Sequence, residues 1–397
     1  MEESERAVSG LDLPPKAIEF LTKSWGIKHL HPPQFEAMPS ILSGSNTLLA
    51  IPTASGKSLV AYIGILRRLL IDEPGSKAVY IVPLKALASE KHEDLVALGG
   101  SVGLTVGLGI GDASGEAKKI DECDVLVCTS EKLDSLMRNR SELMANVSIV
   151  VADEFHLMND KTRGPTLEIN LTRLRYLRPK AQIIALSATV GNCEELATWL
   201  DANLVLSSWR PVALEYSTFH DLHLEPRLVQ SAQMSTEAEI LQPPRDLDGP
   251  KSHPSWAVVN DAIDQDGQVL IFVGTRRSAQ SEALKLSKRI EKRLKKDDPD
   301  RLKRLQDFAS SLEGRSQTAM AERLAESIRG GVAFHHAGLT YGQRKAIEGA
   351  FKEGLLIGLT ATPTLAAGVN LPARRVLVRD LKRWDCLLYT SPSPRDH

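Results

Sequence analysis

The chain carries short runs of consecutive apolar residues, separated by longer stretches in which apolar positions recur with helical spacing. A short, continuous apolar run is typical of a strand that is buried on both faces of a parallel sheet. Strands that alternate with helices predict a doubly wound α/β domain. In the first half of the chain the runs lie at residues 47–50, 78–82, 104–108, 125–128, 147–152 and 183–186.

A second α/β unit is predicted in the other half, which has apolar runs at residues 269–273, 331–336, 356–360 and 375–379.

The segments outside these two units have a different composition. Residues 223–255 are rich in Pro, Gln, Ser, Asp and Gly, which favours long connecting loops with little core. Before about residue 30 we expect a leader and one helix over residues 15–25. A helical stretch over residues 284–306 mixes many lysines and arginines with acidic residues, which favours a solvated helix face.

The stretch Ile-Pro-Thr-Ala-Ser-Gly-Lys-Ser, residues 51–58, lies between a predicted strand and a predicted helix. This order favours a phosphate-binding loop, because N–H groups at a helix N-terminus attract an anion. Lys57 would reach the outer phosphates of a nucleotide, and the Ser58 hydroxyl would ligate Mg²⁺. Ile51 holds the position of the first glycine in the usual pattern. The alternative is a chance Gly-Lys-Ser in a surface turn.

Two adjacent carboxylates, Asp153 and Glu154, follow the buried strand at residues 147–152. Such a pair is costly at the end of a buried strand unless it serves a cation or a proton. Together with the phosphate loop, it predicts that Asp153 holds Mg²⁺ and that Glu154 positions and deprotonates a water molecule. The alternative is an acidic pair that caps a helix.

Other polar residues allow two interpretations each. The amide of Gln34 has the donor and acceptor needed to read an adenine edge, or it is an ordinary residue at a helix start. Ser187 and Thr189 follow a strand, where they could bridge the site to a neighbouring domain or form a plain turn. His335 and His336 would point to opposite sides of a strand, which argues against a metal site with two histidine ligands.

Composition narrows the function classes. The chain has 397 residues, 42% of them hydrophobic, and a net charge of −1, which suggests two or three domains and no global basic signature. The cysteines show neither metal-ligand spacing nor a disulfide framework, which fits a reducing, cytoplasmic location. The chain has no signal-peptide pattern and no apolar run long enough to span a bilayer, so we expect no membrane association.

The order of the motifs along the chain is more specific than any one of them. Pro-Pro-Gln, Gly-Lys-Ser, Pro-Leu-Lys-Ala-Leu, Asp-Glu-Phe-His, Ser-Ala-Thr and His-His-Ala-Gly-Leu are followed by Thr-Pro-Thr-Leu-Ala-Ala-Gly-Val-Asn-Leu-Pro. This series resembles the superfamily-two DExH-box helicases of the superkiller-type branch. Within that branch it is most similar to the archaeal fork-acting DNA helicases related to the helicase part of DNA polymerase theta. The resemblance covers roughly residues 28–384.

The resemblance implies two RecA-like domains in tandem, with ATP and Mg²⁺ between them. It places a leader at residues 1–27, the first domain at 28–213, a connecting region at 214–255 and the second domain at 256–385. It implies an ATP-dependent DNA helicase or translocase of 3′-to-5′ polarity. Such an enzyme would act, as a monomer, on forked or single-stranded DNA in replication-coupled repair. An RNA helicase of the same branch is the alternative substrate class.

The resemblance also implies roles for single residues. The catalytic residues would be Glu154, Asp153 and Lys57. The ATP contacts would be Gln34 at the adenine, Thr53, Ala54, Ser55, Gly56, Lys57 and Ser58 at the phosphates, and Gly368 and Asn370 at the domain interface. The residues that couple hydrolysis to movement would be His156, Ser187 and Thr189. The contacts to the nucleic-acid backbone would be Pro83, Lys85, Gly111, Thr129, Gly274, Thr275 and Thr362.

The pattern of the family stops before its next motif, Gln-x-x-Gly-Arg-x-Gly-Arg, which this sequence does not contain. An arginine of that kind is worth about 10³–10⁵ in rate in related nucleotide hydrolases. Residues 386–397 continue no strand or helix pattern and resemble a translated sequencing adapter, so we expect a non-native tail and an incomplete second domain. The alternative function is therefore a catalytically impaired fragment that binds nucleotide and nucleic acid.

We predict that the 397-residue chain binds ATP–Mg²⁺ weakly and hydrolyses it very slowly, because the motif that carries the family's arginines is absent from it. Steady-state phosphate release, measured with and without single-stranded DNA, checks this. Rapid turnover that single-stranded DNA stimulates would contradict the prediction.

Overall fold

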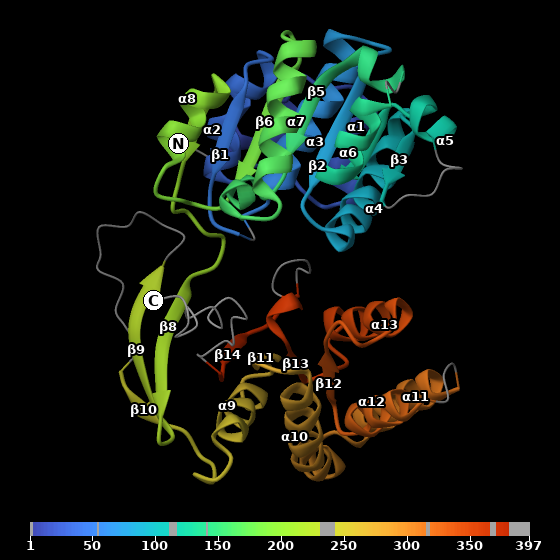
Figure 1. Cartoon of the computed structure of the whole chain (residues 1–397). Coiled ribbons are helices and arrows are strands. Elements are labelled where there is room, and N and C mark those ends of the chain that lie inside the picture. Colours follow the sequence, from blue (N-terminus) through green and yellow to red (C-terminus); the bar gives the residue numbers. More distant parts are fainter. Residues whose placement is uncertain are drawn as a thin grey trace, which may run out of the picture. The chain divides into compact units, whose positions relative to one another are not determined.

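The six apolar runs of the first half form six strands of one seven-stranded sheet, in the order β3-β4-β2-β5-β6-β1-β7 (Figure 1), and the seventh strand, β7, was not predicted. Every neighbouring pair in it is parallel. All residues of β1, β4, β5 and β6 are buried, as expected for strands covered on both faces. The strands are β1 Thr47–Ala50, β2 Lys77–Val82, β3 Val106–Gly109, β4 Val125–Thr129, β5 Val147–Ala152, β6 Gln182–Ser187 and β7 Asn203–Leu206.

The computed structural model describes residues 3–53, 55–110, 117–139, 142–230, 243–314, 318–365 and 371–380. The chain divides into two compact units, of which the first contains the described residues up to Glu215.

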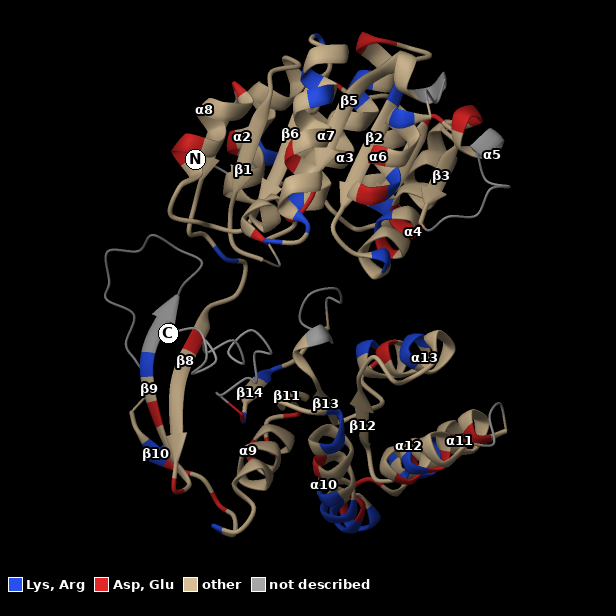
Figure 2. Cartoon of the chain, viewed as in Figure 1, with Lys and Arg blue, Asp and Glu red and all other residues tan. Residues whose placement is uncertain are grey.

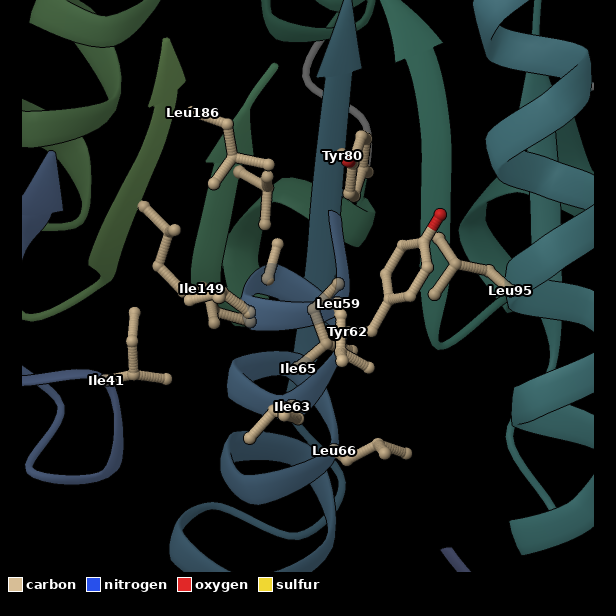
Figure 3. Packing of buried hydrophobic residues seen from close by; sticks show 14 of the residues in the cluster. Ile41, Leu59, Tyr62, Ile63, Ile65, Leu66, Tyr80, Leu95, Ile149 and Leu186 are labelled. Atoms are coloured by element: carbon tan, nitrogen blue, oxygen red, sulfur yellow. The ribbon is translucent and has the colours of Figure 1, made fainter. Parts of the chain in front are cut away.

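Helices cover both faces of the first sheet. Alternate residues of its strands point to opposite faces and belong to two separate apolar clusters. One cluster joins the sheet to α1 Pro15–Glu19, α2 Pro32–Leu42, α3 Lys57–Arg67 and α4 Lys85–Val102. Figure 3 shows part of it, with side chains of α3 packed against those of the sheet. The other cluster joins the sheet to α5 Ala117–Glu122, α6 Ser130–Arg138, α7 Gly164–Leu177 and α8 Cys193–Leu200.

The helix predicted over residues 15–25 is confirmed: α1 continues as a π-helical turn, Phe20–Ser24. This N-terminal segment packs onto the first unit, since Val8, Leu13 and Leu21 are buried in its apolar cluster.

The second unit contains a parallel sheet of four strands, in the order β12-β13-β11-β14. The fold-class prediction of α/β units with parallel sheets is therefore confirmed, whereas the proposed domain boundaries stay predictions. The strands are β11 Val269–Phe272, β12 Val332–His335, β13 Gly358–Ala361 and β14 Arg375–Val378. The helices are α9 Pro254–Ile263, α10 Arg276–Asp297, α11 Pro299–Glu313, α12 Ala319–Arg329 and α13 Tyr341–Lys352.

The helical stretch predicted over residues 284–306 is two helices, because Pro299 cannot continue α10 and instead begins α11. Asp298 caps the second helix by accepting a hydrogen bond from the Arg301 N–H at 2.9 Å. Lys and Arg predominate among the charged residues of α10 (Figure 2), with a few acidic residues between them, and Arg293 pairs with Asp297 at 3.2 Å. The prediction of a solvated face is confirmed for this helix.

The prediction of long loops over residues 223–255 is wrong for residues 223–230, which form a strand, while residues 231–242 lie outside the described residues. β8 Leu214–His220, β9 His223–Gln230 and β10 Arg245–Asp246 form a three-stranded sheet. Asp221 and Leu222 connect β8 to β9, and both have positive φ, 50° and 69°. Such a turn usually carries Asn-Gly, so its sequence gave no hairpin signal. Because backbone pairing holds these strands and most of β8 is exposed, they need no apolar run.

Candidate active site

Apart from Gln34, which lies in α2, the residues predicted to carry chemistry in the first unit lie at or after the carboxyl ends of parallel strands. The loop at residues 51–56 follows β1, Pro83 follows β2, Asp153 follows β5, and Ser187 ends β6. The carboxyl ends of parallel strands lie at one edge of the sheet, where open α/β sheets bind ligands. Strand order decides which of these groups are neighbours: β6 lies between β1 and β5, and β2 lies beside β5.

The phosphate loop ends at Gly56, which has φ 73° and ψ 31° and precedes the first residue of α3. This left-handed conformation is easy for glycine and strained for other residues. Since Gly56 has no side chain to cap α3, the first N–H groups of the helix are suited to an anionic ligand.

Gln34 braces this loop from the first turn of α2. Its Nε2 donates to the carbonyl oxygens of Ser55 at 3.2 Å and of Gly56 at 2.9 Å. Its Oε1 accepts from the His31 N–H at 2.8 Å. Both amide hydrogens are therefore engaged, which leaves one lone pair of Oε1 for an adenine amino group. The adenine contact of Gln34 stays a prediction, but its role as a support of the loop is visible in the structure.

Lys57 is a largely buried cation, with 7% of its surface exposed, and its Nζ donates to the Ile51 carbonyl at 3.4 Å. Burial lowers the pKa of Lys57, and the charges of Glu154 and Asp153 act in the opposite direction. Lys57 from α3 and the acidic pair from the end of β5 thus form one electrostatic cluster, although 96 positions separate Lys57 from Asp153 (153 − 57).

Asp153 and Glu154 are held in a specific geometry. Asp153 is buried, and its Oδ1 accepts from the Glu154 N–H at 2.9 Å while its Oδ2 accepts from the Tyr80 hydroxyl at 2.8 Å. Glu154 has φ 51° and ψ 43°, a left-handed conformation that is uncommon for a residue with a side chain. Strained backbone of this kind gathers at functional sites, which favours the catalytic interpretation over a plain helix cap.

His156 connects the acidic pair with the end of β6. Its Nδ1 lies 3.3 Å from Glu154 Oε2 and accepts from the Ala188 N–H at 3.3 Å. Burial lowers the pKa of His156, which favours the neutral ring. One neutral ring nitrogen cannot donate to the carboxylate and accept from the amide at once, so the two contacts compete. Ser187 contacts the same residue, since its hydroxyl donates to the Ala188 carbonyl at 2.7 Å. Thr189, the third residue predicted to couple hydrolysis to movement, is exposed.

Several residues predicted to contact nucleic acid lie at helix N-termini, which suit phosphate groups. Lys85 begins α4, and Thr129 caps α6 by accepting from the Lys132 N–H at 3.4 Å. In the second unit, Thr275 caps α10 by accepting from the Ser278 N–H at 3.0 Å, and Thr362 directly follows β13.

The Gly274 N–H is engaged within the chain, because it donates to Asp380 Oδ2 at 2.8 Å. Ala54, Gly111, Gly368 and Asn370 lie outside the described residues.

The oxygen donors of Ser58 and Asp153 fit Mg²⁺, which prefers hard oxygen ligands and commonly takes few of them from the protein. Tyr80 was absent from the predicted site. A hydroxyl inside the buried apolar strand β2 is the signal that could have found it, since such a group needs a hydrogen-bond partner. No helix among the described residues is long and apolar enough to cross a membrane.

Residues 31–196 match the family of DEAD/DEAH box helicases. The chain is similar to "ATP-dependent DNA helicase Hel308" of Methanocella arvoryzae, with 41% identity over 98% of this chain and 50% of the relative. The proteins of the same name from Pyrococcus horikoshii and Thermococcus kodakarensis are 44% and 45% identical over 92% and 88% of this chain. Those matches cover 47% and 28% of the relatives, so the chain spans half or less of their length.

We predict that Gly56→Ala weakens nucleotide binding at least tenfold. A left-handed residue with a side chain costs about 1–2 kcal/mol, and the new Cβ would lie 2.4 Å from Gln34 Nε2. Equilibrium binding of a fluorescent ADP with Mg²⁺ measures the effect.

Gly75→Ala is the matched control, because Gly75 has φ 84° but no atom within 4 Å of the added Cβ. It should lose stability to a similar backbone strain and keep nucleotide affinity. Equal affinity of Gly56→Ala and wild type would show that the loop does not need this conformation.

Proposed function

This chain belongs to the DEAD/DEAH box helicases of superfamily two, and from that premise we propose that it is the ATP-driven part of a DNA helicase. One observation carries the proposal most directly. Lys57 at the start of α3 and the Asp153–Glu154 pair at the end of β5 interact electrostatically at the ligand-binding edge of a parallel sheet.

In this proposal the chain's own residues divide the work on ATP. The N–H groups at the start of α3 and the Lys57 ammonium hold the phosphates, and Ser58 and Asp153 hold Mg²⁺. The bound Mg²⁺ supplies positive charge that neutralises the phosphate oxygens. Glu154 orients the attacking water and accepts its proton. The left-handed backbone at Glu154 fixes the start of the side chain that does so.

We assign the coupling of hydrolysis to movement to His156 and the segment after β6. His156 Nδ1 lies equally far, 3.3 Å, from Glu154 Oε2 and from the Ala188 nitrogen. A change of charge or position at Glu154 therefore changes which of the two contacts His156 can make. Ser187 and Thr189 flank Ala188, so this competition reaches the residues expected to signal the state of the nucleotide.

For the nucleic acid we propose DNA, because the relatives bear the name of a DNA helicase. The helix N-termini at Lys85, Thr129 and Thr275 would contact phosphates and would impose little sequence preference, which suits a translocating motor. A net charge of −1 is compatible with such contacts, since backbone donors supply part of the grip. The 3′-to-5′ polarity, the action on forks and the monomeric state rest on the likeness to the family.

We predict that Glu154→Gln abolishes hydrolysis and leaves nucleotide binding intact, since the amide keeps the shape of the side chain but cannot accept the proton. The expected loss is about 10²–10⁴-fold, the usual contribution of a general base. Single-turnover hydrolysis with the 397-residue chain in excess over labelled ATP is sensitive enough for a slow enzyme. Loss of ATP binding in the same variant would argue that Glu154 is structural.

We predict tighter binding of single-stranded DNA than of RNA of the same sequence, with little dependence on base sequence. Fluorescence anisotropy over a salt series tests this, and the logarithm of affinity should fall by about 0.7 per phosphate contact for each unit in the logarithm of salt concentration.

Lys85→Ala should weaken binding to all DNA sequences alike and reduce the salt slope, while ADP–Mg²⁺ binding serves as the control.

In the comparison of the two nucleic acids, tighter binding of RNA than of DNA would favour the RNA-helicase alternative.

A further inference from the structure

Tyr80 places a hydroxyl in the otherwise apolar interior beneath the nucleotide site. It lies in β2, is fully buried, and belongs to the apolar cluster that joins α3 to the sheet. The hydroxyl donates to Asp153 Oδ2 at 2.8 Å. A buried hydroxyl bonded to a carboxylate makes a charge-assisted hydrogen bond, which is stronger than one between neutral groups.

The same strand fixes both the backbone and the side chain of Asp153. The Asp153 N–H donates to the Ile81 carbonyl at 2.9 Å, one residue beyond Tyr80. Asp153 Oδ1 accepts from the Glu154 N–H at 2.9 Å, so each carboxylate oxygen has its own donor. Two separate donors fix the plane of a carboxylate, and each oxygen keeps a lone pair for a further partner.

The Tyr80 hydroxyl also interacts with Ser58, the other residue expected to ligate Mg²⁺. Burial and the charge of Asp153 raise the pKa of Tyr80 well above its usual value, and the Ser58 hydroxyl acts in the opposite direction. Burial and the Asp153 charge thus favour the neutral hydroxyl, which is the form that donates to Asp153 Oδ2. The Tyr80 hydroxyl thus interacts with both side chains, Ser58 from the start of α3 and Asp153 from the end of β5.

Tyr62 provides an internal comparison. It lies in α3, its ring centroid is 6.0 Å from that of Tyr80, and only 3% of its surface is exposed. Figure 3 shows both rings in the same apolar layer. The Tyr62 hydroxyl, however, donates at 2.9 Å to Asp94 Oδ2, a carboxylate of α4. The two tyrosines thus share size and burial but hold different carboxylates.

We propose that Tyr80 is a positioning residue that orients Asp153 toward Ser58 so that the two side chains bind Mg²⁺ together with the nucleotide. This inference rests on the proposed function. Groups that hydrogen-bond a metal ligand fix its orientation, and their removal typically lowers metal affinity about 10–100-fold. Tyr80→Phe keeps the ring and its packing but removes the donor to Asp153 Oδ2.

The test compares Tyr80→Phe, Tyr62→Phe and wild type as the full 397-residue chain. The affinity for a fluorescent ADP is measured in EDTA and over a Mg²⁺ titration. For Tyr80→Phe we expect the half-saturating Mg²⁺ concentration to rise about 10–100-fold, with the metal-free ADP affinity unchanged. Tyr62→Phe should titrate like wild type. Thermal unfolding in EDTA should show comparable losses for both variants, since each loses one buried hydrogen bond.

A double-mutant cycle with Asp153→Asn separates positioning from general packing. If Tyr80 acts through Asp153, Tyr80→Phe should cause no further change of the Mg²⁺ midpoint in the Asp153→Asn background. Equal shifts in that background and in wild type would overturn the inference.

The remaining outcomes distinguish the inference from the function on which it rests. A Tyr80→Phe titration equal to that of Tyr62→Phe would overturn the positioning role alone. Failure of wild type to show any Mg²⁺-dependent nucleotide binding would instead contradict the proposed function.

Discussion

A buried carboxylate at the end of β5 is the constraint on which the site depends. Asp153 is only 6% exposed, and an ionised group in such surroundings is costly unless donors and counter-charges surround it. The structure supplies the Tyr80 hydroxyl from β2, the Glu154 N–H from the next residue and the nearby charge of Lys57. The adjacency of β2 and β5 therefore supplies one of the donors that this buried carboxylate needs.

The phosphate loop also depends on a contact that is distant in the sequence, the hydrogen bonds of Gln34 to its carbonyl oxygens. Gln34 lies 22 residues before Gly56 and uses both amide hydrogens on the loop carbonyls. The left-handed Gly56 brings its carbonyl within reach, and a side chain there would occupy the position of the Gln34 amide. The glutamine in the first turn of α2 and the glycine before Lys57 therefore depend on each other.

The fold was predictable where local composition and burial agree. Strands buried on both faces are mostly apolar, so β1, β2, β4, β5 and β6 could be predicted from continuous apolar runs. β8 and β9 were missed because most side chains of β8 are exposed and the turn between the strands uses Asp221 and Leu222 rather than glycine. Pro299 marks the break between α10 and α11 in the sequence, but the helical pattern on both sides of it led to the prediction of a single helical stretch.

The sequence by itself determined the chemical groups and their order: a glutamine at the start of a helix, a lysine and serine after one strand, and two carboxylates after another. Motifs carry this information because each is a local arrangement of strand, turn and helix. Only the tertiary structure decided that Tyr80 holds Asp153, 73 residues away, and that His156 stands between Glu154 and Ala188. Such partners depend on strand order and register, which long-range packing sets and no short stretch of sequence encodes.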